Sequence, residues 1–275
     1  MTHKMIEYHC FISGLPELFF DSFGGSFGLG TFLDEAESVL EPAHFDWVNS
    51  LVMARRHKSV LMKLNGEMVD DIPVLPYSFK WLEPDNEEFK LLPVYLQEFA
   101  EKFRRGKDVI TPHQWEIILT EGYYGFLIAT GNGFLNSWAN FDMDVKNYIT
   151  SKKCLDDLPQ KYLQVVAGNL FARRLLEFSP AHKEIQVDWP LAATIDKIMD
   201  NPNLLEREKS LDRLSWDEID RLNLFNYFTI EVILGYTLKL LILERWKNIL
   251  QPEMRVEVSR IAEEKVTDHF MKSPL

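Results

Sequence analysis

The chain has 275 residues, enough for one large domain or two small ones. Its content of 46% hydrophobic and 13% aromatic residues is that of a folded protein and excludes a disordered chain. A formal net charge of −12, from 30 basic and 42 acidic residues, repels phosphate backbones, so we predict no nucleic-acid binding.

The two cysteines, Cys10 and Cys154, are too few for a disulfide framework or a Cys-rich zinc site. We expect both to be small buried hydrophobic residues. The opening MTHKMIEYHC lacks the charged-then-apolar layout of a signal peptide, which predicts a cytoplasmic protein.

The first elements are short. Residues 5–20 are apolar and predict a short strand or helix that Gly14 and Pro16 interrupt. The glycine-rich run at residues 23–30 lacks the GK[ST] of a phosphate loop and is expected to be a flexible loop. A helix over residues 32–40 follows, with Thr31 as its N-cap.

A second helix is predicted from Pro42 to Leu64, and it contains the positive cluster ARRHK. That cluster is typical of a solvated helix face, and a contact with an acidic partner is the alternative. Its cations are candidate partner contacts: Arg55, Arg56 and Lys58.

Residues 66–91 contain three prolines and predict a long connection and a hinge. We expect one helical domain over residues 1–275, with two lobes, 1–90 and 91–275, as the alternative. A helix over residues 92–105 then ends in two further candidate partner contacts, Arg104 and Arg105.

Residues 111–153 predict an antiparallel helical hairpin. Thr111 and Pro112 form an N-cap followed by a first-turn proline, and Gly131-Asn132-Gly133 supplies the turn near residue 130. Another helical region is expected over residues 158–178, where Gly168 marks a break.

Three shorter helices are expected next, over residues 191–199, 204–214 and 216–224. The charges of residues 204–214 place that helix on the surface. Ser215, with Glu218 three positions later, forms a capping box that begins the third.

Residues 226–250 predict the central helix, with one broad apolar stripe that includes Leu240 and Trp246. Glu231 and Lys239 interrupt its apolar run, so it is not a transmembrane segment. A charged helix over residues 253–270 is expected to end the chain. The fold class is therefore all-α, with antiparallel helical hairpins packed around a long helix in the C-terminal half.

Motifs for catalysis or metal binding are missing from the sequence. No His pair has i, i+4 spacing, and there is no HExxH or GxSxG motif. Asp142 and Asp144 are two residues apart, which directs them to different faces of a helix. Glu231 and Glu244 are expected at the solvent edge, or else in internal ion pairs. We predict no catalytic residue, no cofactor and no metal ligand.

Two segments carry a family resemblance: W-x-x-F-D-x-D-V-K-N, starting at Trp138, and F-T-I-E-x-x-L-G-Y-x-x-K-L-x-I-L-E-R-W, starting at Phe228. Together with residues 8–18 and 207–216, they resemble an uncharacterised bacterial family often encoded among the subunits of V/A-type rotary ATPases. The motif residues that we single out are Trp138, Asp144, Asn147, Glu231, Tyr236, Glu244, Arg245 and Trp246.

That family is similar to the C subunit of these ATPases, called d in vacuolar enzymes. The resemblance implies an all-helical fold of related repeats that joins the central stalk to the membrane ring and has no active site. In its helices an acidic residue precedes an Asn and basic positions, a pattern that Asp144, Asn147 and Lys152 or Lys153 match in one helix. Glu244, Arg245 and Asn248 match it in a second helix.

The resemblance predicts a non-catalytic subunit or accessory protein of a V/A-type ATPase, peripheral to the inner face of the cell membrane. Its partners would be central-stalk subunits and the membrane ring, and the enzyme would transport protons or sodium ions. A helical adaptor unrelated to the ATPase is the first alternative. The second is an enzyme, which predicts a deep cleft with convergent ionisable groups of perturbed pKa.

Overall fold

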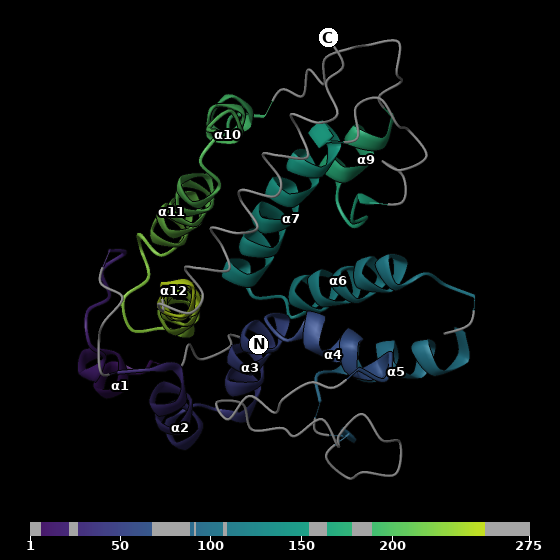
Figure 1. Cartoon of the computed structure of the whole chain (residues 1–275). Coiled ribbons are helices and arrows are strands. Elements are labelled where there is room, and N and C mark those ends of the chain that lie inside the picture. The colour runs from purple at the N-terminus through teal and green to yellow at the C-terminus, as the bar shows by residue number, and fades with distance from the viewer. Residues whose placement is uncertain are drawn as a thin grey trace.

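The computed structural model describes residues 7–21, 27–67, 89–90, 92–106, 109–153, 164–177 and 189–250. Within these ranges the regular structure is helical and no strand occurs, which confirms the all-α prediction (Figure 1). The helices are α1 (His9–Gly14), α2 (Leu29–Val39), α3 (Pro42–Ala54), α4 (His57–Leu64), α5 (Val94–Gly106), α6 (Pro112–Ala129), α7 (Gly133–Lys153), α9 (Leu170–Glu177), α10 (Ala192–Met199), α11 (Leu204–Leu222) and α12 (Ile230–Ile249).

The central element is α12, which packs against α2, α3, α7 and α11 (Figure 1). The predicted single stripe was too narrow, because Leu234, Leu238 and Leu241 are buried as well as Leu240. Neighbouring helices cover α12 on several sides, so nearly its whole circumference contributes to the core. A helix that is apolar all round is the kind that belongs inside a protein.

The helices α6 and α7 pack together as the predicted hairpin. Thr111 and Gln114 form a reciprocal capping box at the start of α6, with Pro112 in the first turn. Gly131 has φ 73° in the turn, a backbone conformation that favours glycine. Local sequence signals therefore determine both ends of α6.

The predicted helix over residues 42–64 is wrong in its continuity, because it divides into α3 and α4 at Arg55 and Arg56. Neither residue is a helix breaker, so the local sequence gives no reason for the interruption. At the break Arg55 donates a 2.5 Å hydrogen bond to the carbonyl oxygen of Leu241 in α12. A tertiary contact thus accompanies the break.

Two predicted helix starts are also wrong. The helix α2 begins at Leu29, with Gly28 rather than Thr31 as its N-cap. Residues 204–222 form one helix, α11, so Ser215 lies inside it and caps nothing. Asn203 is the cap that α11 uses: its side-chain oxygen accepts from the backbone N–H groups at 205 and 206, at 3.0 and 3.3 Å.

The remaining predictions have mixed outcomes. Residues 5–20 contain the helix α1, and the break at Gly168 is confirmed by non-helical backbone with φ 154°. Cys10 is exposed, which contradicts its predicted burial. Cys154, nearly all of the proline-rich connection and the helix over residues 253–270 lie outside the described residues, and the choice between one domain and two lobes stays a prediction.

Among the described residues, no helix is long and apolar enough to span a bilayer.

Candidate functional site

A cleft of about 610 Å³ opens beside the central helix. Its walls come from the α3–α4 junction, α6, α7, the segment around Val166, α11 and α12. Its volume falls within the ~300–1,000 Å³ typical of small-molecule sites. Segments far apart in the sequence therefore meet at one concave site.

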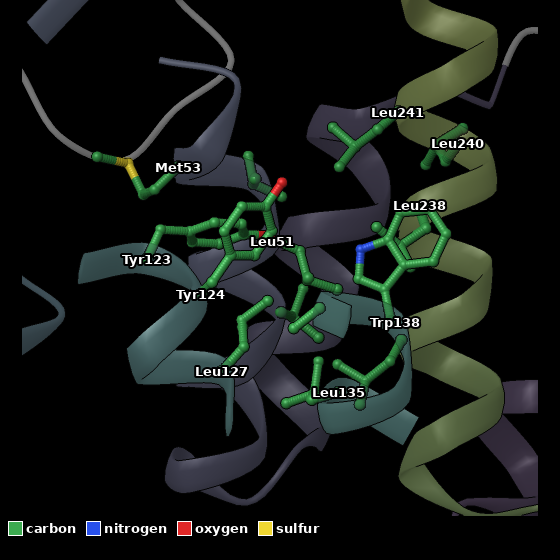
Figure 2. Close-up of a cluster of buried hydrophobic side chains, with 14 of the residues drawn as sticks. Leu51, Met53, Tyr123, Tyr124, Leu127, Leu135, Trp138, Leu238, Leu240 and Leu241 are labelled. Atoms are coloured by element: carbon green, nitrogen blue, oxygen red, sulfur yellow. The ribbon is translucent and has the colours of Figure 1, made fainter. Parts of the chain in front are cut away.

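The floor of the cleft is apolar. Leu51 of α3, Trp138 of α7, and Leu238 and Leu241 of α12 contribute to it. Figure 2 shows Leu51, Trp138 and Leu238 in one cluster of buried hydrophobic side chains. These side chains are nearly buried, so they expose only narrow strips of apolar surface to the cleft.

Arg55 is the most unusual cation of the cleft wall. It stays accessible to water, yet burial among the surrounding helices, followed by the nearby Arg245 guanidinium, lowers its pKa to about 10. Exposure and a lowered pKa occur together because the cleft is open: water reaches the Arg55 guanidinium, although protein atoms surround it on several sides. At neutral pH Arg55 remains charged.

A network of charges crosses from α12 to α11 at one side of the cleft. Arg245 pairs with Glu208 at 2.5 Å and with Asp212 at 3.3 Å, and the Trp246 indole donates to Asp212 at 2.7 Å. Burial raises the pKa of Asp212, and Arg245 opposes that shift. Arg245 and Trp246, both motif residues, therefore join the last two described helices.

A second network lies on α6 and α7. Lys146 donates to Asp142 at 2.8 Å and to the Tyr124 hydroxyl at 2.7 Å, and that hydroxyl donates to Asp142 at 2.7 Å. Burial and the adjacent Asp142 raise the pKa of Tyr124, so the phenol stays protonated. This Tyr–Asp–Lys cluster therefore provides no phenolate base.

His57 also lines the cleft, and its Nε2 lies 3.0 Å from the Tyr95 hydroxyl. Burial, followed by repulsion from Lys146, lowers the pKa of His57 to about 3. The imidazole is therefore neutral at physiological pH. His57, Arg55 and Asp212 are thus cleft residues whose pKa values are shifted by burial.

The five cations predicted as partner contacts lie at different sites in the fold. Arg55 and Lys58 line the cleft, whereas Arg56 is only 1% exposed. Arg104 lies over the Phe89 ring, 5.0 Å from its centroid, and the exposed Arg105 lies 3.8 Å from Glu101. Arg104 and Arg105 do not line the cleft, so the five do not form one surface.

The motif residues of α7 bind the segment that follows it. Asn147 is 1% exposed, and its side-chain amide exchanges two 2.9 Å hydrogen bonds with the backbone of Val166. Asp144 accepts from Asn169 at 2.7 Å, on a different side of the helix from the Asp142 cluster, as predicted. Both residues therefore position one wall of the cleft.

The motif residues of α12 make long-range contacts. Glu231 accepts from the Asn132 side chain at 2.7 Å, and the Tyr236 hydroxyl donates to the carbonyl oxygen of Pro16 at 3.1 Å. Glu244 lies 3.4 Å from the backbone nitrogen of Leu29, at the start of α2. Each carboxylate therefore meets a neighbouring segment, and neither forms an ion pair within the described ranges.

Sequence reasoning missed the loop between α11 and α12. Leu224, Phe225 and Tyr227 are 63%, 83% and 68% exposed there. The base of the loop is fixed, because Tyr8 donates from its backbone to the carbonyl oxygen of Phe228 at 2.6 Å. The signal was the run LFNYF, residues 224–228, of which all but Phe225 were assigned to the ends of two predicted helices.

The part of the chain that the structure describes contains no candidate metal site. No group of three or more His, Cys, Asp or Glu side chains is arranged there to hold an ion.

Comparisons with known proteins give one match. Residues 5–253 match the family described as "Protein of unknown function (DUF2764)". No curated protein and no solved structure matches the chain. Because the match covers most of the sequence, the chain belongs to the DUF2764 family of proteins of unknown function.

Proposed function

We propose that this protein is a non-catalytic subunit or accessory protein of a V/A-type rotary ATPase. It would dock between the central stalk and the membrane ring, at the inner face of the cell membrane, and serve proton or sodium transport. The link to the ATPase comes from the sequence motifs in α7 and α12. The role as a docking protein comes from the exposed loop between α11 and α12.

That loop supports docking because it displays large apolar side chains on a fixed base. Asn226 donates to the carbonyl oxygen of Leu222 and to the side chain of Asn223, at 3.3 and 3.1 Å, so the loop has internal hydrogen bonds. Leu224, Phe225 and Tyr227 remain exposed on it. Exposed apolar clusters mark interaction sites, and tyrosine is common among residues that dominate binding energy.

The overall charge is compatible with the proposed partner. A chain of net charge −12 favours association with basic ends of stalk subunits. Arg105, which is largely exposed at the end of α5, offers a local contact for an acidic subunit. Such charges accelerate and orient docking more than they strengthen it.

The motif residues support a scaffold role and not a catalytic one. Asn147, Glu231 and Arg245 each contact another part of the same chain. We therefore propose that the motifs preserve the shape that presents the loop, and that the chain carries out no reaction itself.

The test is affinity purification of the tagged chain, at native expression level, from a host that encodes the ATPase. We expect stalk subunits to co-purify with the natural protein and to fall to about a tenth with Phe225→Ser/Tyr227→Ser. Val109→Ser is the matched control, because Val109 is 87% exposed outside this loop. Natural protein that brings down no ATPase subunit contradicts the proposal, and other partners would support the adaptor alternative.

A further inference from the structure

The charged groups that line the cleft are not fully paired. They comprise four cations (Arg55, Lys58, Lys146 and Arg245) and three carboxylates (Glu116, Asp142 and Asp212), a local balance of +1 in a chain of net charge −12. Lys146 and Arg245 pair with carboxylates, at 2.8 and 3.3 Å. Arg55 and Lys58 have no carboxylate within 4.0 Å in the described parts of the chain.

Arg55 retains the capacity to bind an anion. A guanidinium has five N–H donors, and the bond to the Leu241 carbonyl oxygen is the one that Arg55 makes among the described residues. The planar group matches a carboxylate or phosphate with two parallel hydrogen bonds. Burial removes part of the hydration of this cation, although water still reaches it, and a bound anion would supply further hydrogen-bond acceptors to the guanidinium.

An apolar wall begins beside these cations. Leu241 supplies the carbonyl oxygen that Arg55 contacts, and its side chain lines the same cleft with Trp138 and Leu238 (Figure 2). A ligand with an anionic head at Arg55 would therefore lay an apolar body along α12. Ligand-binding clefts combine apolar walls with a few polar groups that orient the ligand.

We propose that the cleft between α3, α6, α7, α11 and α12 binds an amphipathic organic anion, with its carboxylate on Arg55 and Lys58 and its apolar body against Trp138, Leu238 and Leu241. Binding here is separate from any assembly with an ATPase, since the exposed loop residues do not line the cleft.

The experiment is isothermal titration calorimetry of the full-length protein with decanoate as the probe. We expect saturable binding of one decanoate per chain. Decyltrimethylammonium, with the same tail and the opposite charge, should bind at least about tenfold more weakly. Equal affinity for the two probes, or no saturable decanoate binding, overturns the proposal.

Variants locate the site. Arg55→Gln should weaken decanoate binding at least about tenfold, and Lys58→Gln should weaken it several-fold, while Arg105→Gln serves as the exposed control outside the cleft. Lys58 is exposed, so its substitution keeps the test valid if Arg55→Gln fails to fold. Decanoate affinity that is unchanged in Lys58→Gln, or in a folded Arg55→Gln protein, overturns the proposed site.

Discussion

The carboxylate of Asp144 lies in a partly buried environment that disfavours its charged form. Burial raises its pKa from 3.8 to about 6, although the hydrogen bond from Asn169 opposes the shift. Between these two pKa values the folded state binds more protons than the unfolded state. The free energy of unfolding therefore decreases as the pH rises from about 4 to about 6, as far as Asp144 contributes.

Asp144→Asn removes that titration and keeps an oxygen that accepts from Asn169. We expect the variant to gain stability relative to the natural protein as the pH rises from 4 to 7, because only the natural protein must ionise a buried acid. Urea unfolding at several pH values measures this difference. A difference that stays constant with pH would show that Asp144 does not titrate abnormally.

Gly235 of α12 lies close to Ile219 of α11 and to Asn223, the residue that caps the end of α11. A Cβ there would lie 2.1 Å from Nδ2 of Asn223 and 3.1 Å from Cγ2 of Ile219. We expect Gly235→Ala to destabilise the protein by about 1–3 kcal/mol, because the crowding outweighs the better helix propensity of alanine. Chemical denaturation measures the change.

Gly125 is the matched control for this prediction. It lies in α6, is exposed, and has no neighbouring atom within 4 Å of a built Cβ. Gly125→Ala should therefore stabilise by about 0.5–1 kcal/mol. If both alanine variants shift stability in the same direction, the close packing of α11 on α12 is not what restricts residue 235.

At the scale of elements, the stability of the protein depends on the burial of α12. Leu240 is 2% exposed, so Leu240→Ala should cost about 2–5 kcal/mol in the free energy of unfolding. Leu224→Ala, at a site 63% exposed, should change it by less than about 0.5 kcal/mol. Equal melting temperatures for the two variants would contradict the central position of α12.

The sequence predicted those elements whose ends have local signals. The hairpin of α6 and α7 was predictable because Thr111, Pro112 and the glycines of the turn act through their immediate neighbours. The break at Arg55 was not, because it coincides with a contact to Leu241, 186 residues away. The false start at Ser215 shows that a capping sequence does not begin a helix when the flanking residues already favour one.

At the scale of the whole molecule, the cleft could not be predicted because its walls come from separate stretches of the chain. Lys58, Lys146 and Asp212 are ordinary charged residues in their own helices, and only the packing of those helices brings them to one site. The motif residues were identifiable, but their contacts were not. Asn147 binds the backbone of a segment that has no recognisable motif of its own.

At this scale we propose a helical scaffold that binds a larger assembly. The most direct measurement is purification of the intact V/A-type ATPase through a tagged catalytic subunit, followed by quantification of this chain by mass spectrometry. We predict that the chain is present in a fixed ratio to the stalk subunits. Its consistent absence from an active, intact complex would contradict the proposed role.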